Sequence, residues 1–381
     1  MKIIHIVHGK ANPNSNNGIS RVVYYLNKHE RLAGIDSQIW ALVDGQKEHR
    51  TYKRDDYVTI DCFPRIHLFN KKIINYLIKN KENIDLVHFH LIWFYDKNII
   101  AKALRKHNIP FIITTHGTYA NPHAYTGKRL LAKWLYELDY LNMANECHIL
   151  TPEEGTGLKK YGYTGKCFVA YNGFDPNEIP CTLNDRFFEN QPFSQRLIIS
   201  TVSVLRQDKN TDLIIKALTL LPPDKRKQMA FILIGPDYKG NAAKYNRLAV
   251  TLGVKDSFYW IGALYNQDKY DAMASSDGYI MASDSEGFSM AIIDAMANQL
   301  PMILTSGCNM NYISNDRFFI KCEPYPQHIA SALLQFIEMS KEEREELGIR
   351  AKNILVKELY WNKITVTMIE NYKRIINNHI Q

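Results

Sequence analysis

Short runs of apolar residues alternate with longer amphipathic stretches along most of the 381-residue chain. This alternation is typical of parallel α/β architecture, in which buried strands are joined by helices that cover the sheet. In the first half, the runs that predict strands are KIIHIV, DSQIWALV, LVHFHL, PFIITTH, CHILT and CFVAYN. In the second half they are RLIISTVSVL, MAFILIGP, SFYWIG, GYIMAS and MILTS.

The periodic pattern stops between Pro176 and Gln195, a stretch that holds three prolines. Loss of periodicity together with proline indicates a linker between domains. We therefore expect a first domain over residues 1–176 and a second over 195–362. An amphipathic pattern over 363–381 predicts a final helix that packs back on the first domain. Two doubly wound, parallel-sheet domains that face each other across a cleft would bind ligands at the carboxyl ends of their strands.

Composition supports a globular protein, with 46% hydrophobic and 23% charged residues. No apolar run approaches the roughly 18 residues that a membrane-spanning helix needs. The opening MKIIHIVHGKANPN has too short an apolar stretch for a secretion signal and predicts a first strand instead. The six cysteines form no CxxC pair, which favours free thiols in a reducing compartment and offers no zinc-site spacing. We expect a cytoplasmic location.

The net charge of +8 is unevenly distributed. Residues 1–180 hold 24 Lys and Arg against 17 Asp and Glu, whereas residues 181–381 hold 23 against 22. The basic surplus therefore belongs to the first half, where it suits an anionic membrane surface or a phosphorylated ligand. The chain shows no interleaved arginine and aromatic stripe, so we do not expect nucleic acid as a partner.

The segment SDSEGFSMAIIDAMANQLP carries the first candidate chemistry. A helix that begins near Phe288 would place Glu286 and the N–H groups of residues 287–289 at its positive end, which favours a phosphate or a sugar hydroxyl. Helical rise then puts Asp294 roughly 12 Å further along the axis. Two carboxylates at this spacing could hold the hydroxyls at the two ends of a nucleotide-sugar. The alternative is a capping Glu and a buried acid paired with an arginine.

A second candidate lies in STVSVLRQDKNTDLIIKAL. A strand is expected to end at Leu205 and a helix to begin near Thr211, which leaves Arg206 and Lys209 in the connecting turn. Cations are unusual before a helix N-terminus, where anions are favoured. Both side chains could therefore converge on a diphosphate, whose developing charge they would neutralise as it leaves. A solvated Arg and Lys in an ordinary loop is the alternative.

EGFSMAIIDAMANQLPMILT, together with RQDKN, resembles the retaining nucleotide-sugar glycosyltransferases of family 4, which have the two-domain GT-B fold. The family signature has a Glu at its head and a second Glu eight residues later, where this chain has Glu286 and Asp294. Ser289 and Gln299 stand where glycine is usual. In the first half, IDLVHFH, IPFIITTHGTY and VAYNGFD look like the paired strands and closing segment of the family's first domain. NPNSNNGISRVVYYL looks like a thin version of its glycine-rich loop.

The resemblance implies a role for each matching residue. Catalytic roles, in contacting the donor sugar or stabilising the leaving diphosphate, fall to His116, Arg206, Lys209 and Glu286. Donor-binding roles, through backbone N–H groups, close backbone approach or the ribose hydroxyls, fall to Gly18, Gly287, Phe288, Ser289 and Asp294.

The same resemblance implies transfer of a hexosyl unit with retention, without a cofactor or a metal ion, from a UDP-sugar in preference to a GDP-sugar. The acceptor would be a hydroxyl of a saccharide or of a lipid-linked saccharide in surface polysaccharide synthesis. Basic amphipathic segments, FNKKIINYLIKNKENI and TGKRLLAKWLYELDYL, suit an anionic lipid interface. We therefore expect possible peripheral attachment to the inner face of the cell membrane; ordinary packed helices are the alternative.

Other functions are weighed against this one. The departures at Asp294, Ser289 and Gln299 leave open a non-catalytic subunit that binds a nucleotide-sugar for a partner enzyme. A dinucleotide oxidoreductase would need GxGxxG after the first strand, which VHGKANPNSNNGIS lacks. We identify no cofactor lysine for a phosphorylase. His88 and His90 alternate on one strand, but no third metal ligand stands at a suitable spacing, so we interpret both as structural.

Overall fold

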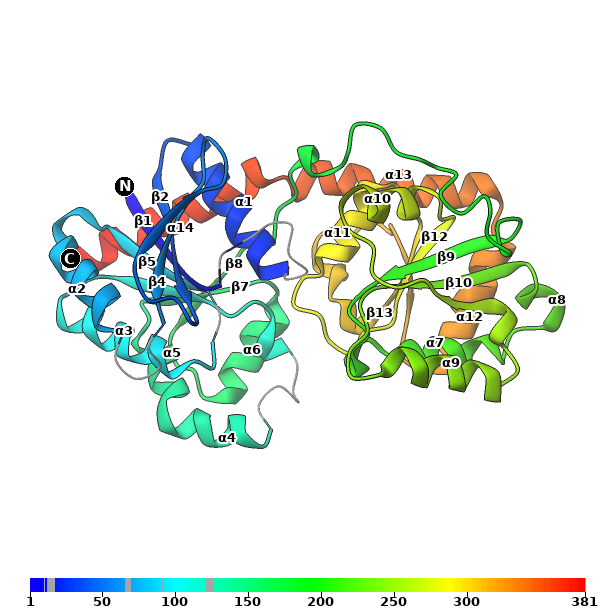
Figure 1. Ribbon diagram of the computed structural model, residues 1–381, viewed down its shortest axis with the longest axis horizontal. Helices are drawn as coiled ribbons and strands as arrows, with labels where there is room; N and C mark the ends of the chain where they lie inside the picture. The colour runs from blue at the N-terminus through cyan, green and yellow to red at the C-terminus, as the bar shows by residue number, and fades with distance from the viewer. Residues whose placement is uncertain (10, 12–17, 66–69, 91, 121–125, 381) are drawn as a thin grey trace. The chain divides into compact units, whose positions relative to one another are not determined.

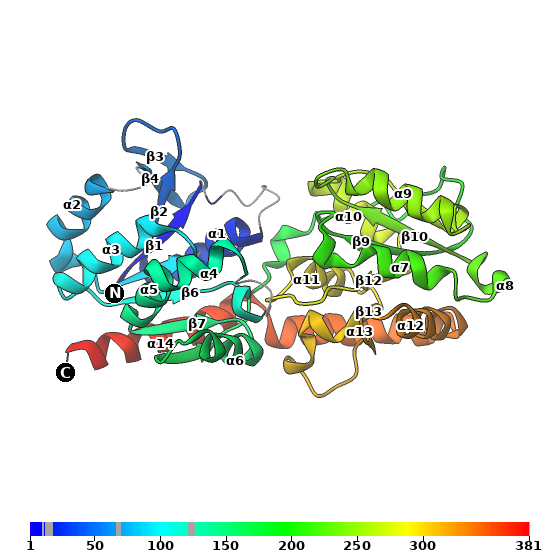
Figure 2. The ribbon, with the colours of Figure 1, turned by 90° about the horizontal axis from the view of Figure 1, so that it is seen from below.

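The structure, a computed structural model, describes residues 1–9, 11, 18–65, 70–90, 92–120 and 126–380. The chain divides into two compact units. Unit 1 comprises Met1–Gly173 and Leu359–Gln381, and unit 2 comprises Phe174–Glu358. Each unit contains one β-sheet flanked by helices (Figure 1; Figure 2), so the predicted α/β class with two doubly wound parallel sheets is confirmed.

The sheet of unit 1 has eight strands in the order β3-β4-β2-β1-β5-β6-β7-β8. All neighbours are parallel except β3 and β4, which pair antiparallel at one edge. The strands are β1 (Lys2–His8), β2 (Asp36–Val43), β3 (Arg50–Lys53), β4 (Thr59–Pro64), β5 (Leu86–His90), β6 (Phe111–Thr114), β7 (Glu146–Ile149) and β8 (Lys166–Val169).

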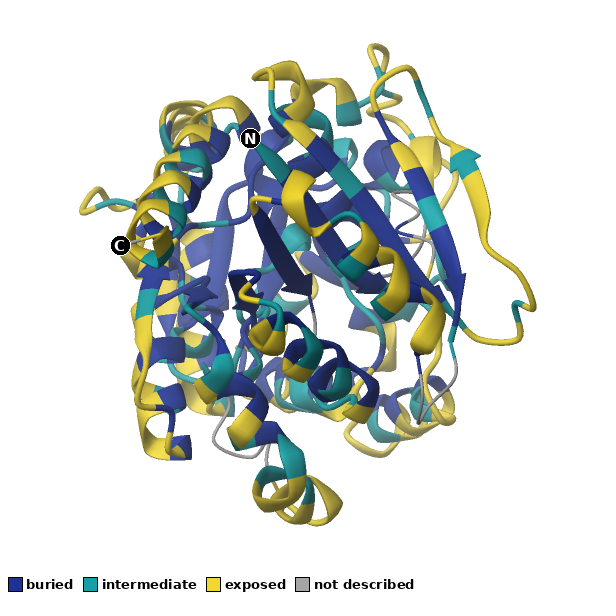
Figure 3. Cartoon of the chain, turned by 90° about the vertical axis from the view of Figure 1, so that its left-hand side faces the viewer, coloured by how far each residue is buried: buried dark blue, intermediate teal, exposed yellow. Residues whose placement is uncertain are grey.

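Helices cover both faces of this sheet, and their outer residues are exposed while the strands between them are buried (Figure 3). The longer helices are α1 (Gly18–Leu32), α2 (Lys71–Lys79), α3 (Tyr95–Lys106), α6 (Pro152–Tyr161) and α14 (Trp361–Ile380). Shorter helical segments are η1 (Lys81–Asn83), η2 (Thr118–Ala120), α4 (Lys128–Ala132), the π-helix η3 (Lys133–Glu137) and α5 (Leu138–Met143).

The sheet of unit 2 has six parallel strands in the order β11-β10-β9-β12-β13-β14. They are β9 (Leu197–Val202), β10 (Met229–Ile234), β11 (Phe258–Trp260), β12 (Gly278–Met281), β13 (Met302–Thr305) and β14 (Ile320–Cys322). The run MAFILI is buried along its whole length, as is usual for a strand that helices cover on both faces.

The helices of unit 2 are α7 (Thr211–Leu218), α8 (Pro223–Arg226), α9 (Asn241–Thr251), α10 (Asn266–Ala274), α11 (Met290–Ala297), α12 (Pro326–Glu338) and α13 (Lys341–Glu358). Single 3₁₀ turns are η4 (Pro176–Glu178), η5 (Gln207–Lys209), η6 (Lys255–Ser257), η7 (Ser306–Cys308) and η8 (Met310–Tyr312). Across the described ranges of both units, no helix combines the length and apolar content needed to cross a membrane.

Strand order locates the position in each sheet where ligands are expected. In unit 1 the chain runs outward from β1 to β2 and later returns to β5 on the other side of β1. In unit 2 it runs outward from β9 to β10 and returns to β12 on the other side of β9. Such a reversal leaves a crevice at the carboxyl ends of the two central strands. Loops that follow β1 and β5, or β9 and β12, are therefore placed to bind a ligand.

The stretch Pro176–Gln195, which we expected to be a linker, belongs to unit 2. Phe188 and Phe193 are 3% and 1% exposed and pack with Ile198 and the strand β10. The loss of periodicity therefore reflects an irregular segment, not a linker, and its two phenylalanine side chains are buried in the core of unit 2. The division between the units falls earlier, at Gly173.

The last helix, α14, belongs to unit 1 although it follows all of unit 2 in the sequence. Its buried face, which includes Trp361, Met368 and Tyr372, packs against unit 1. Arg374 forms a two-pronged ion pair with Glu146 of β7, with N–O distances of 2.5 and 2.8 Å. Burial of these side chains ties the two sequence segments of unit 1 together.

Gly173, the last residue of the first segment of unit 1, lies close against Trp361 at the start of α14. A Cβ atom built on Gly173 would lie 2.3 Å from the Trp361 ring. We expect Gly173→Ala to lower the free energy of unfolding by about 1–3 kcal/mol, since the indole is buried and has little room to move. Urea unfolding measures this loss. The double variant Gly173→Ala/Trp361→Leu should lose less than the sum of the two single variants, and a neutral Gly173→Ala would contradict the close packing.

Candidate functional site

The turn after β9 carries Arg206 and Lys209, as the sequence predicted. It forms the single 3₁₀ turn η5 and then Asn210, which adopts a left-handed conformation with φ 52° and leads directly into α7. Asparagine tolerates this conformation better than most residues. The reversal at Asn210 places Lys209 at the carboxyl end of β9.

The loop after β12 carries Glu286. Its backbone N–H donates to the carbonyl of Gly307 at 2.7 Å, and its carbonyl accepts from the Asn309 side chain at 2.7 Å. The carboxylate is 9% exposed and its Oε1 accepts from the Ser283 hydroxyl at 2.5 Å. These contacts hold the side chain in one orientation at the carboxyl end of β12.

The two loops are joined by charged and polar contacts. The Lys209 Nζ donates to Glu286 Oε1 in an ion pair whose side chains are 18% and 11% exposed. Asn210 Nδ2 donates to the carbonyl of Ala282 at 2.9 Å and to Asp284 Oδ1 at 2.6 Å. Because β9 and β12 are hydrogen-bonded neighbours, these contacts lie at the strand ends where the sheet order predicts a ligand.

Gly307 makes the close approach of a third loop possible. A Cβ atom at this position would lie 2.2 Å from the carbonyl oxygen of Asp284 and 2.5 Å from that of Ser283. Only glycine can therefore bring its carbonyl to the Glu286 N–H in this geometry. Gly307 was not among the predicted site residues, because nothing in the run SGC distinguishes it from a glycine in an ordinary turn.

Arg206 does not stand free beside Lys209. Its guanidinium donates to both carboxylate oxygens of Asp208, at 2.9 and 2.7 Å, and its side chain is 55% exposed. Each of the two cations is thus paired with its own carboxylate. That both turn to a diphosphate stays a prediction.

Asp294 lies on α11, which begins at Met290, two residues later than expected, with Ser289 as its N-cap. The carboxylate is 3% exposed. It accepts from Lys269 Nζ at 2.9 Å and from the Tyr270 hydroxyl at 3.2 Å, both on α10. The structure thus contains the buried ion pair of the alternative, but with a lysine where we named an arginine. Nothing in the spacing of NQDKYDAMA identified Lys269 beforehand.

In unit 1, His116 follows β6 and has a left-handed backbone with φ 50°. Its Nε2 lies 3.1 Å from Nδ1 of the buried His90. Burial, reinforced by the electrostatic effect of the nearby His148 and Lys97, lowers the pKa of His116 to about 3. His116 is therefore a neutral imidazole at the carboxyl end of a central strand.

The backbone beside His116 is held by Glu154, at the start of α6. Glu154 Oε1 accepts from the Thr115 hydroxyl at 2.5 Å and its Oε2 from the backbone N–H of Leu150 at 2.9 Å. Burial raises the pKa of Glu154 to about 7. Gly18, the other unit 1 residue expected at the site, is the exposed first residue of α1; the expected glycine-rich loop over 12–17 lies outside the described residues.

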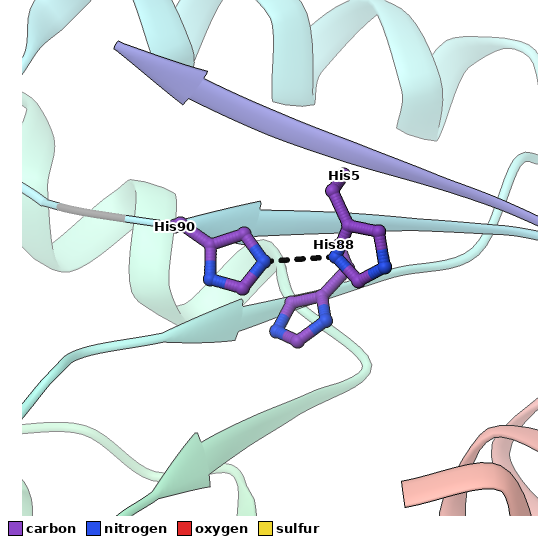
Figure 4. A group of neighbouring side chains, drawn as sticks. All are labelled: His5, His88 and His90. Carbon is purple, nitrogen blue, oxygen red and sulfur yellow. Dashed lines mark hydrogen bonds between the residues drawn. The ribbon is translucent and has the colours of Figure 1, made fainter. Parts of the chain in front are cut away.

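Three buried histidines lie together in the core of unit 1 (Figure 4). His88 and His90 come from β5, and His5 comes from the paired strand β1. One ring nitrogen of each lies within 4.8 Å of the others. Sequence spacing gave no third partner for His88 and His90 because His5 is brought beside them by strand pairing, more than eighty residues away in the chain.

Comparison with known proteins identifies the family. Residues 16–178 match the family model described as Glycosyltransferase Family 4, and residues 184–354 match the model described as Glycosyl transferases group 1. The chain is a family 4-type glycosyltransferase. The predicted resemblance is therefore confirmed.

Two curated relatives are similar over part of their length. An uncharacterised glycosyltransferase of Methanocaldococcus jannaschii is 22% identical over 212 residues, which cover 55% of this chain and 53% of the relative. The GDP-mannose:cellobiosyl-diphosphopolyprenol alpha-mannosyltransferase of Xanthomonas campestris is 25% identical over 225 residues, which cover 58% and 56%. The matches thus span about half the length of these relatives.

Solved structures show the GT-B fold. Anabaena HepE in complex with UDP superposes with a TM-score of 0.77 at 16% identity, covering 98% of this glycosyltransferase and 100% of HepE. Sucrose-phosphate synthase of Thermosynechococcus elongatus superposes with a TM-score of 0.79 at 16% identity, covering 99% and 100%. The fold predicted from the sequence is confirmed.

The buried pair of Lys269 and Asp294 predicts a measurable stability effect. We expect Lys269→Met to lower the free energy of unfolding by about 2–3 kcal/mol, because it removes the cation from a carboxylate that stays buried. Replacement of both partners, Lys269→Met/Asp294→Leu, should recover most of this loss in urea unfolding. Lys216→Met, which breaks the exposed pair with Asp212, serves as the control and should change stability by less than about 1 kcal/mol. Equal effects of Lys269→Met and Lys216→Met would contradict the buried pair.

Proposed function

We propose that this glycosyltransferase moves a hexosyl unit, with retention, from a nucleoside-diphosphate sugar to a hydroxyl of a saccharide or lipid-linked saccharide in surface polysaccharide synthesis. The observation that carries the proposal is the Lys209–Glu286 pair, which joins the loops after β9 and β12 at the switch point of unit 2. A cation and a carboxylate side by side suit a ligand with a charged diphosphate and a hydroxyl-bearing sugar.

Each candidate residue receives one part of this donor. Lys209 and Arg206 counter the diphosphate charge, and Glu286 accepts hydrogen bonds from sugar hydroxyls. The N–H groups of residues 287–289, ahead of α11, face the sugar and phosphate, where a helix N-terminus favours negative charge. Asp294 accepts from the ribose hydroxyls, one methylene short of the usual glutamate. The family resemblance assigns His116 to the donor sugar and Gly18 to close backbone approach.

The proposed chemistry needs no metal ion at the diphosphate. The bond from the anomeric carbon to the diphosphate breaks, and a bond from that carbon to the acceptor oxygen forms on the same face. The acceptor's proton passes to an oxygen of the leaving diphosphate. Arg206, Lys209 and the N-terminus of α11 supply the positive charge that stabilises this leaving group.

We favour a UDP-sugar over a GDP-sugar as the donor, and both are to be assayed. HepE, which shares the fold, has been solved in complexes with UDP and with UDP-glucose. The Xanthomonas relative is named for GDP-mannose. A screen of radiolabelled UDP- and GDP-sugars for slow hydrolysis identifies the donor without knowledge of the acceptor.

Removal of either member of the pair should abolish most turnover. We expect Lys209→Ala and Glu286→Ala each to lower kcat by about 100- to 1,000-fold, because each removes a charge that contacts the donor where the bond breaks. Release of the nucleoside diphosphate from the donor found in the screen measures kcat. Circular dichroism and thermal melting check that each variant remains folded.

Matched controls are available in the same unit. Lys216→Ala and Glu338→Ala each break an exposed ion pair, with Asp212 and Lys225 respectively, and should leave kcat unchanged. Near-normal kcat in Lys209→Ala or Glu286→Ala would refute the role given to that residue. Calorimetric binding of a nucleotide-sugar with no turnover on any acceptor would instead favour a non-catalytic subunit.

We further propose that unit 1 meets an anionic membrane through α4 and η3. Leu130, Leu131, Trp134 and Leu135 are 49%, 64%, 71% and 68% exposed on this segment. Lys128, Arg129 and Lys133 lie among them in the sequence. Large apolar side chains that gather on one exposed segment beside basic residues are suited to a lipid interface.

The other basic segment has the properties of an ordinary packed helix. In α2, Ile73 and Leu77 are each 1% exposed and pack into the core of unit 1. The two sequences thus differ in the structure: α2 buries Ile73 and Leu77, whereas α4 and η3 expose four large apolar side chains.

Charge substitution on α4 and η3 tests this surface. We expect Leu131→Glu/Trp134→Glu to lower sedimentation with phosphatidylglycerol vesicles by at least about tenfold, because two apolar contacts are lost and two negative charges repel the lipid. Val250→Glu, at a 63% exposed site in unit 2, is the control and should bind like the unaltered chain. No binding of the unaltered chain at low salt would end the proposal.

A further inference from the structure

A row of hydrogen-bonded side chains runs from Glu30 to His116 through the core of unit 1. Glu30 Oε2 lies 2.7 Å from His5 Nε2, His5 Nδ1 lies 2.9 Å from His90 Nε2, and His90 Nδ1 lies 3.1 Å from His116 Nε2. Figure 4 shows the middle link. Glu30, His5 and His90 are at most 1% exposed, whereas His116 is partly exposed. Among the residues that the structure describes, Nδ1 of His116 has no hydrogen-bond partner.

The hydrogen bonds of the row can run in either of two directions, with each ring donating either toward Glu30 or toward His116. A neutral imidazole donates through one nitrogen and accepts through the other. Burial and the neighbouring imidazoles lower the pKa of His90 well below its usual value, and burial lowers that of His116 to about 3. Each of these rings therefore holds one proton near pH 7. Which of its two nitrogens carries that proton depends on how many protons are bound by Glu30 and its neighbours.

A second row, which also ends at Glu30, fixes that count. His148 Nε2 donates to the carbonyl of Ala170 at 2.9 Å, since a carbonyl can only accept. Burial lowers the pKa of His148 to about 4, so its Nδ1 accepts from the Thr114 hydroxyl at 2.8 Å. Thr114 in turn accepts from His88 Nε2 at 2.5 Å. Because burial keeps His88 neutral as well, its Nδ1 accepts from the Tyr372 hydroxyl at 2.9 Å.

Tyr372 also lies 3.0 Å from Glu30 Oε1. The Tyr372 hydroxyl has a single proton, which cannot serve both His88 and Glu30. If every ring were neutral and Glu30 ionised, the second row would therefore lack one proton, so it must hold one more. That proton already balances the charge of Glu30. A second one on His5 would leave a net positive charge in the core, which is strongly unfavourable. His5 is therefore neutral and donates from Nε2 to Glu30 Oε2, which also accepts from the Ser37 hydroxyl at 2.5 Å.

We propose that Glu30, acting through His5 and His90, fixes the tautomer of His116. Nε2 of His116 carries the proton and donates inward to His90, and Nδ1 presents a lone pair at the carboxyl end of β6. His5, His90 and Glu30 are thus positioning residues. If His116 contacts the donor sugar, a step that rests on the proposed function, it accepts a hydrogen bond from a hydroxyl and cannot donate one.

A metal site is the competing explanation of the three buried histidines. All six ring nitrogens of His5, His88 and His90 already have protein partners. A cation bound by all three rings would have to displace one hydrogen-bond partner from each of them. The observed contacts therefore favour the hydrogen-bonded row.

Nitrogen-15 NMR of the unaltered full chain, labelled at histidine, tests the proposal directly. Long-range ¹H–¹⁵N correlations distinguish Nδ1–H, Nε2–H and imidazolium forms, and single His→Asn variants assign the signals. We expect His5, His90 and His116 to be neutral with the proton on Nε2. A proton on Nδ1 of His116, an imidazolium at His5, or one equivalent of zinc in the same sample by mass spectrometry would overturn the proposal. This measurement needs no donor, so it fails or succeeds separately from the proposed function.

Two variants then test whether the row positions the proton of His116 or only packs the core of unit 1. In Glu30→Gln the amide oxygen accepts from His5 and the amide N–H donates to Tyr372, so the tautomer should persist and kcat should stay within about twofold. His90→Phe interrupts the row, so His116 should show both tautomers and kcat should fall about tenfold, with KM changed less. His107→Phe, outside the row, is the control. An unchanged His116 tautomer in a folded His90→Phe variant would overturn the positioning role.

Discussion

The attraction between Lys209 and Glu286 is the constraint on which unit 2 depends at its ligand-binding edge. Two charges that are largely removed from water are tolerated only when each has a partner in good geometry. Here the partners sit on loops that follow neighbouring strands, so the pair fixes the distance between those loops. The Ser283 hydroxyl donates to the carboxylate, the carbonyl of Gly307 accepts from the Glu286 backbone N–H, and Asn210 joins the two loops through the carbonyl of Ala282. Under the proposed function, a phosphate-bearing donor would meet a cation that is already oriented, so little ordering would be left to occur on binding.

Unit 1 uses the same topology with different chemistry. Its strands β1, β5 and β7 carry the buried imidazoles of His5, His88, His90 and His148, and burial lowers the pKa of the last three. A neutral imidazole network tolerates a dry core because every ring both donates and accepts, which an ion pair cannot do. The two units thus differ at equivalent strand ends. Unit 2 has an ion pair there, whereas unit 1 has an uncharged row of hydrogen bonds.

Most of the fold was predictable from the sequence because its evidence is local. Each parallel strand is a continuous apolar run, and each covering helix has an amphipathic period. Glu286, Lys209 and Asp294 were found because they interrupt those local patterns. The partners of these residues could not be found in this way. Lys269 meets Asp294 through the packing of α10 on α11, and His5 meets His90 through strand pairing; neither contact leaves a periodic trace in the sequence. Phe188 and Phe193 were missed because an irregular segment gives no period from which burial can be inferred.

The return of α14 to unit 1 also sets an order of assembly. Unit 2 is one uninterrupted stretch of chain, whereas unit 1 needs a helix that is synthesised after the whole of unit 2. Until then the sheet of unit 1 lacks Tyr372 beside Glu30 and Arg374 beside Glu146. During synthesis, unit 2 is therefore the first unit whose chain is complete. Until α14 is made, unit 1 keeps the buried histidines of its core without that covering helix.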